Sequence, residues 1–236
     1  EEMAGGTFAK YIANGYEGVY VCVMNNLSGE QLEKIPGNWD FVTDKTTFAL
    51  LPSPKMYQIG ALESMQIRSE EAKAGAKVLG SLPPIFLNFN EPELWLGRKL
   101  VIYGSKEFKE YNPPGRKQIA LATRYDEDVE LVVNLLKKYK PEIVIIHTLG
   151  GEKLDHGNSG YLMYEAFTRA LKEEIPVGKL WMPVNQWLLH NKHGKADVHV
   201  DVKKYLALKY KALNKHLSQN GGDGRDYTMS NHTQPK

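Results

Sequence analysis

The chain has 236 residues, of which 42% are hydrophobic and 25% are charged, and its formal net charge is +2. This length and composition predict one large domain with its own core, over residues 1–220, followed by a polar tail over residues 221–236. The near-neutral charge argues against a nucleic-acid-binding face, and no apolar run approaches the roughly 20 residues of a transmembrane helix, so we expect neither nucleic acid nor membrane as a partner.

Helical and strand-like patterns alternate along the chain. The predicted elements are, in order, a helix over residues 6–15, a strand over 18–24, a helix over 60–79, strands over 83–89 and 99–104, a helix over 125–140, a strand over 142–147, a helix over 159–174, strands over 179–184 and 196–202, and a helix over 202–219. Gly15, Gly80 and Pro141 supply helix-stop signals, and Thr7 is a candidate N-cap. The apolar run 18–24 is typical of a strand buried on both faces. This order predicts an α/β sandwich around a mostly parallel sheet.

Histidine and acidic side chains follow the predicted strand 142–147. His147 closes this strand, and Asp155 and His156 come after a short loop that contains two glycines. Ligands bind beyond the carboxyl ends of the strands in open α/β sheets, so we expect this loop at the functional edge. On the residues alone two interpretations stay open. Either His156 is a metal ligand or catalytic residue, or Asp155 caps the next helix and His156 is a polar residue at the rim.

Four segments of the chain together resemble a known family. They are, in order, GGTFAKYIANGY, IRSEEAKAGAKVLG with PPIFLNF after it, PEIVIIHTLGGEKLDHGNSGYLMYEAF, and KYKALNKHLSQ. This set resembles the PIG-L (LmbE-like) family of zinc-dependent sugar N-deacetylases, over most of the chain from Gly5 to Gln219. The resemblance implies a Rossmann-like three-layer sandwich and hydrolysis of the acetamide of an N-acetylglucosamine-type substrate, a small amino sugar.

The resemblance also implies a zinc site. The late HPDH segment of the family maps onto residues 153–156, so His156 is the expected zinc ligand. The AHPDDE segment, which carries two further ligands and the general base, maps ahead of Glu1. We therefore expect the chain to be an incomplete record that lacks its first strand. Zinc held by about three protein ligands lowers the pKa of a bound water toward about 7, which supplies hydroxide near neutral pH.

A lysine stands where the HPDH segment has its first histidine. The resemblance implies that this position serves as the acid or the oxyanion partner and that Asp155 orients it. Lys153 is able to stabilise an oxyanion as a point charge, but a lysine is a poor acid near neutral pH. His147 is then an alternative proton donor, and a solvent-facing Lys153 is the other interpretation.

Four more residues match segments that the resemblance places near the substrate. They are Arg68, Glu71, His216 and Gln219. The guanidinium of Arg68 suits sugar hydroxyls or a phosphate, because it presents a fixed fork of donors, and Glu71 would brace the site. The alternatives are an ion pair of Arg68 with Glu70 or Glu71, and a packing role for His216.

Other interpretations compete with this one. His190, His193 and His199 form a weak candidate for a second metal site, and Gly194 favours a loop there. The main alternative function is a metal-free carbohydrate-binding module of the same fold, because Lys153 departs from the family pattern. A nucleotide-binding module is a weaker third candidate. The single cysteine, Cys22, fits a reducing compartment, so we expect a cytoplasmic protein, and a homo-oligomer is left open.

Overall fold

The computed structural model describes residues 4–24, 61–89, 93–96, 99–102, 126–147, 149, 154–183 and 196–216. The chain divides into two compact units. The first unit contains the amino-terminal elements up to Asn88, a hairpin, and the carboxyl-terminal helix. The second contains most of the stretch from residue 117 to residue 199. Each unit is described by itself.

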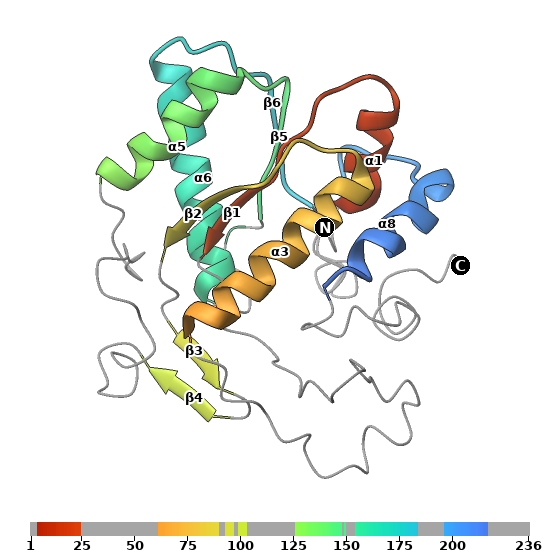
Figure 1. The fold of residues 1–236 in the computed structure, drawn as a ribbon. Helices are drawn as coiled ribbons and strands as arrows, with labels where there is room; N and C mark the ends of the chain where they lie inside the picture. Colours follow the sequence, from red (N-terminus) through yellow and green to blue (C-terminus); the bar gives the residue numbers. More distant parts are fainter. Residues whose placement is uncertain are drawn as a thin grey trace. The chain divides into compact units, whose positions relative to one another are not determined.

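The first unit pairs two strands with three helices (Figure 1). Apart from the hairpin, its elements are α1 (Gly5–Ala13), β1 (Val21–Met24), α3 (Ala61–Leu79), β2 (Ile85–Phe89, whose last residue falls in the second unit), the short 3₁₀ helix η1 (Lys203–Tyr205) and α8 (Leu206–Leu213). The N–H of Leu82 donates to the carbonyl of Gly18 at 2.9 Å, and that of Ile85 to Tyr20 at 2.8 Å. From the first bond to the second, the residue numbers increase in both segments, so β1 and β2 are parallel neighbours.

Small side chains allow the three helices of this unit to pack closely. Ala9 of α1, Leu79 of α3 and Ala212 of α8 form a fully buried cluster. The rings of Phe8 and Tyr20 lie beside it, with centroids 4.4 Å apart. In Figure 1, α8 lies against α1 and α3, in agreement with their contacts.

Three described helices end in a Schellman motif, in which a residue just after the helix adopts a left-handed conformation. α1 ends before Gly15, with φ of +93°, and α3 ends before Gly80, with φ of +76°. Each is closed by the pair of backbone bonds that defines a Schellman motif, such as those from Gly80 to Lys77 and from Ser81 to Ala76. The helix stops predicted at these two glycines are therefore confirmed. The third of these helices ends at Lys172 and has Glu174 in the same position, with φ of 57°, although a glycine adopts this conformation at lower cost.

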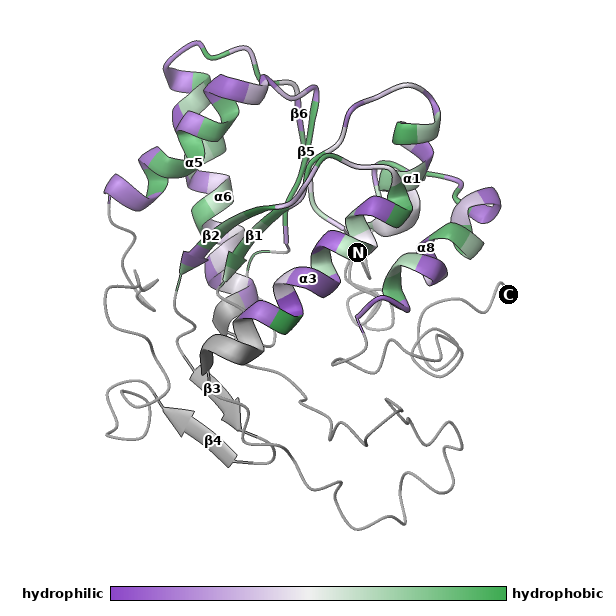
Figure 2. Ribbon diagram, in the orientation of Figure 1, coloured by the Kyte–Doolittle hydropathy of each residue, from purple (hydrophilic) through white to green (hydrophobic). Residues whose placement is uncertain are grey.

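The second unit combines two parallel strands with two packed helices. Its elements are α5 (Asp126–Tyr139), β5 (Ile143–Ile145), α6 (Leu154–Lys172) and β6 (Lys179–Trp181). β5 and β6 are parallel, with Val144 opposite Leu180. α5 and α6 pack against each other and bury apolar faces that the hydropathy colouring in Figure 2 also marks. The buried residues of these faces are Val129, Val132, Val133 and Leu136 on α5, and Leu162, Ala166, Phe167 and Ala170 on α6.

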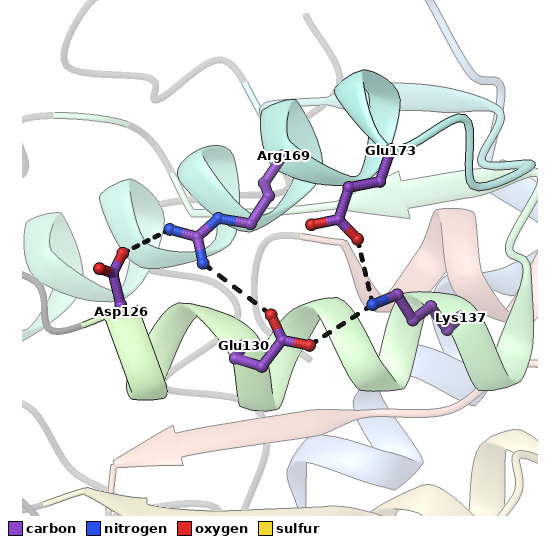
Figure 3. A network of polar contacts seen from close by, with 5 residues as sticks. All are labelled: Asp126, Glu130, Lys137, Arg169 and Glu173. Atoms are coloured by element: carbon purple, nitrogen blue, oxygen red, sulfur yellow. Dashed lines mark hydrogen bonds and ion pairs between the residues drawn. The ribbon is translucent and has the colours of Figure 1, made fainter.

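A network of ion pairs joins α5 to α6 at the surface (Figure 3). Arg169 donates to Asp126 at 2.6 Å and lies 3.9 Å from Glu130, while Lys137 lies 3.0 Å from Glu173 and 3.4 Å from Glu130. The hydrogen bond to Glu173 raises the pKa of Lys137, and that to Asp126 raises the pKa of Arg169. Because both pKa values are raised, Lys137 and Arg169 stay charged at neutral pH; the pairs are lost in strong alkali, where the cations lose their protons, and in acid, where the carboxylates gain them. Water screens these exposed groups, so the network orients the two helices more than it stabilises them.

Several predicted elements differ from the observed ones. Residues 196–202 do not form the predicted strand; they run without regular structure into η1. β1 is half-buried rather than covered on both faces, and its one described neighbour is β2. Thr7 lies inside α1, whose N-cap position is Ala4. A strand over residues 93–96, β3 (Glu93–Leu96), was not predicted; it pairs antiparallel with β4 (Lys99–Ile102), which was. The parallel strands alternating with helices confirm the α/β class.

Candidate active site

The first component of the candidate site is the end of β5. Val144 and Ile146 are buried, and the N–H of Ile146 donates to the carbonyl of Trp181 at 3.0 Å. This bond carries the parallel pairing one residue beyond the strand. His147 follows directly and is half-buried. The backbone next to His147 is therefore held by β6, as predicted for a residue at the carboxyl edge of a sheet.

The second component is the first turn of α6. This helix begins at Leu154, five residues before the predicted start, so Asp155 and His156 are its second and third residues rather than a cap ahead of it. His156 is exposed. A side chain in a helical turn has a fixed direction, which a loop would not give it.

The structure brings His147 and His156 together. Their ring centroids lie 4.6 Å apart and the rings are tilted by 35°. Both residues make further contacts. The exposed ring of His156 and the half-buried ring of His147 are therefore in contact. Either imidazole has the chemistry to bind a metal ion or to transfer a proton. This contact joins two of the residues that the sequence singled out.

The described residues do not supply a complete zinc site. The imidazole of His156 has the chemistry of a zinc ligand, but among the residues that the structure describes no group of three His, Cys, Asp or Glu side chains is placed to hold a metal ion. Lys153 and the side chain of Asp155 lie outside the described part of the chain, as do His190 and His193. His199, the third of that histidine group, is exposed.

The predicted substrate residues of the first unit lie on α3 and at the end of α8. Glu71 is buried, with 8% of its surface exposed, and Arg68, one turn earlier on the same face, is half-buried. Both make further contacts. Glu70 instead pairs with Lys73 at 2.7 Å, on the exposed side. His216 is half-buried just after α8, and Gln219 lies outside the described residues. Their roles stay predictions.

One residue near this site was not singled out from the sequence. The side-chain amide nitrogen of Asn158, in α6, is buried and has no hydrogen-bond partner. Nothing in the pattern HGNSG distinguishes it from an ordinary polar helix residue.

Among the described helices, none has the length and apolar character that crossing a membrane requires.

Residues 1–167 match the sequence model of the PIG-L family, which is described as GlcNAc-PI de-N-acetylase. No curated protein matches the chain.

Solved structures with a similar fold include two deacetylases and a hydratase. N,N'-diacetylchitobiose deacetylase from Pyrococcus horikoshii superposes with a TM-score of 0.58 at 19% identity, over 92% of this chain and 65% of that protein. The chain thus spans less than two thirds of that deacetylase. A deacetylase of the teicoplanin biosynthesis pathway gives a TM-score of 0.51 at 16% identity, over 92% of this chain and 79% of that protein.

The hydratase is GalB, a 4-carboxy-2-hydroxymuconate hydratase from Pseudomonas putida. Its TM-score is 0.54 at 16% identity, over 98% of this chain and 85% of that protein. At these identities the similarities establish the fold, which confirms the α/β class. A hydratase with this fold shows that the fold alone does not determine the reaction.

Proposed function

We propose, from the premise that this chain belongs to the PIG-L family, that the protein is a zinc-dependent N-deacetylase that hydrolyses the acetamide of an N-acetylglucosamine-type substrate. The family's description as a de-N-acetylase makes it a family of amide hydrolases. The observation that carries the proposal is the contact between His147 and His156, with ring centroids 4.6 Å apart. It places two imidazoles at the carboxyl edge of a parallel strand, where α/β proteins bind ligands.

His156 is the residue of this site that would hold zinc. It is exposed in the first turn of α6, and imidazole is a common ligand of this metal. The resemblance assigns the remaining ligands to the family's AHPDDE segment. When bound, zinc supplies a nucleophilic water near neutral pH and polarises the acetamide carbonyl.

The chain's own residues would handle the proton and the developing charge. Hydrolysis adds water to the carbonyl carbon and breaks the C–N bond, and the departing amine nitrogen needs a proton. We assign this proton to His147, because its ring contacts His156 and histidine is the commonest general acid. Lys153 would stabilise the oxyanion as a positive charge, and Asp155 would orient Lys153. Arg68, Glu71, His216 and Gln219 would bind the sugar.

The wider proposals follow from the sequence. We propose one domain over residues 1–220 with a polar tail over 221–236, a small amino sugar as the substrate, and a cytoplasmic location, which a chain with the single cysteine Cys22 permits. Neither nucleic acid nor membrane is expected as a partner, and formation of a homo-oligomer is open to a measurement of mass in solution.

Incubation of the full-length protein with N-acetylglucosamine and its glycosides is expected to release acetate and free amine in equal amounts. Dialysis against a chelator should lower the rate at least about 100-fold, because the metal supplies the nucleophile, and added zinc should restore it. Enzymatic measurement of acetate, with an amine-reactive dye as the second readout, tests both expectations. Binding of the sugar without acetate release would contradict the proposal in favour of a carbohydrate-binding module.

Replacement of His147 with Phe is expected to lower kcat about 100-fold without removing zinc, because the ring contact with His156 is kept while the proton-transferring nitrogens are lost. Steady-state kinetics and elemental analysis measure the two effects. His199→Phe is the matched control, because His199 is an exposed histidine of the same unit, and it should leave both quantities unchanged. A His147→Phe variant with wild-type kcat would exclude His147 as the acid.

A further inference from the structure

The exposed side of η1 and α8 carries positive charge alone. From residue 202 to residue 216 the chain contains no aspartate or glutamate. Apart from Ala207, the exposed residues of this stretch are all lysines, namely Lys203, Lys204, Lys211 and Lys215, which are termed the lysine face. Counted through Ala207, they follow one another at about one helical turn, and residues one turn apart lie on the same side of a helix.

The apolar side chains of α8 face its own unit. Ala212 and Leu213 are buried, and Tyr205 and Leu208 pack against the cluster that α8 forms with α1 and α3. In agreement, α8 lies against these two helices in Figure 1. The lysine face is therefore the part of α8 that is left for solvent or for a partner.

The charges of the lysine face do not stabilise the helix that carries them. Lys203 and Lys204 stand just ahead of the N-terminus of α8, which is the positive end of the helix dipole and disfavours cations. Lys211 and Lys215 are like charges one turn apart, so they repel each other. Within the described residues no carboxylate forms an ion pair with any of these ammonium groups. Asp201, the nearest acid in the sequence, instead accepts a hydrogen bond from the backbone N–H of Lys203 at 3.0 Å.

α5 shows the opposite arrangement in the same chain. Its first turn carries acids and its last turn carries lysines, as the helix dipole favours. Lys137 on this helix also pairs with Glu130 and Glu173. The unpaired charge of a single sign on α8 is thus a local feature, and an anionic partner would offset the repulsion that it causes.

We propose that the lysine face is a docking site for an acidic helix of a partner protein. This docking site is independent of the proposed function. Lysines one turn apart match carboxylates that repeat at the same spacing along a second helix, and the small side chain of Ala207 between them lets the two helices approach. Over residues 202–216 no arginine occurs and no aromatic or large apolar side chain is exposed. The face therefore lacks the groups that insert into a membrane or stack on nucleic-acid bases.

A dye-labelled, alanine-rich peptide with glutamate at every fourth position is the probe for this site. Fluorescence anisotropy is expected to show that it binds the protein, and that a peptide of the same composition with its glutamates at one end binds more weakly. Salt at about 1 M should abolish binding, because the Debye length then falls to about 3 Å.

The variant Lys204→Glu/Lys211→Glu should weaken binding of the peptide about 10-fold, because repulsion replaces two attractive pairs. Its Tm should stay constant or rise, since an acid suits the N-terminal end of α8 and Lys211→Glu places one a turn before Lys215. Lys138→Glu/Lys172→Glu is the matched control. It changes the net charge equally at two exposed lysines of the second unit and should leave binding nearly unchanged.

Weaker binding to Lys204→Glu/Lys211→Glu, with binding kept in the control, supports the proposal. Absent binding to the wild type overturns it, and so does an equal loss in both variants, which would reflect net charge alone. A fall in the Tm of Lys204→Glu/Lys211→Glu by several degrees overturns it too, because the lysines would then serve the fold. Equal binding of the two peptides, or tighter binding of single-stranded DNA or an acidic polysaccharide with the same number of charges, would exclude an acidic helix as the specific partner.

Discussion

Under the proposed function, replacement of His156 with Ala is expected to strip most of the zinc from the protein and to lower acetate release more than about 100-fold. Loss of a residue that merely supports a metal ligand already costs about 10- to 100-fold in metal affinity or activity, so loss of a ligand costs more. The side chain is exposed in the first turn of α6, and its removal leaves no buried cavity. Elemental analysis of the purified protein measures the zinc, and the acetate assay measures the activity.

Two comparisons make this result specific to His156. His199→Ala removes another exposed histidine of the same unit and should leave the zinc stoichiometry at the wild-type value. With the metal removed by a chelator, both variants should unfold within about 0.5 kcal/mol of the metal-free wild type, as is usual for surface substitutions. A His156→Ala variant with full zinc would exclude this residue from the ligand set. Together with His147→Phe, which should keep its zinc, the variants distinguish the zinc ligand from the proton donor in this pair of imidazoles.

The sequence predicted the position of this pair but not its contact. The apolar run 142–147 identified a strand, and the rule that ligands bind at carboxyl edges then placed His147 at a functional edge. The family resemblance, which the match over residues 1–167 confirms, pointed to His156. That the two rings meet depends on the path of the intervening loop and on the early start of α6 at Leu154. Hydrophobic periodicity predicts neither the path of the loop nor the first residue of the helix. Gly157 also made a later helix start equally plausible.

The helices were predicted better than the strands because their ends carry local signals. Gly15 and Gly80 end α1 and α3 where expected, since each adopts a left-handed turn that a side chain disfavours. The strand predicted over residues 196–202 is wrong, because an alternating pattern indicates only a segment with one buried and one exposed face. A strand also needs a hydrogen-bonded neighbour. Here the last residue, Val202, instead packs against Gly6 of α1, where an added Cβ would lie 3.0 Å from the Val202 side chain.

The amide of Asn158 illustrates what the sequence leaves undetermined. Whether a polar helix residue is solvated, paired or buried without a partner depends on neighbours that are distant in the chain. Glu174 makes the same point for the backbone. A glutamate carries no signal for the left-handed conformation, yet it closes α6 because the chain must turn there to enter β6. Both features follow from tertiary packing rather than from local preference.

Replacement of Gly178 with Ala is expected to lower the free energy of unfolding by about 3 kcal/mol, at the upper end of the usual cost of overpacking. A Cβ at this position would overlap the backbone carbonyl of Glu142, which cannot rotate away as a side chain would. The N–H of Gly178 donates to Pro141 at 2.8 Å, and that of Lys179 donates to Glu142 at 2.8 Å. These bonds set the start of the β5–β6 pairing, so relief of the overlap requires β6 to move away from β5. Urea denaturation measures the loss, and for a chain of this size the Tm should fall by roughly 10 °C.

Gly15→Ala is the matched control for Gly178→Ala, because each position requires a glycine for a different reason. A Cβ on Gly15 would meet nothing within 4 Å, but its φ of +93° is a conformation that L-residues disfavour. This substitution should therefore cost only about 1 kcal/mol, the penalty of a left-handed residue. Equal losses at the two sites would mean that β6 shifts freely and that the contact with Glu142 is unimportant. A larger loss at Gly178 would show that the pairing is rigid up to Ile146, and with it the backbone that holds His147 beside His156.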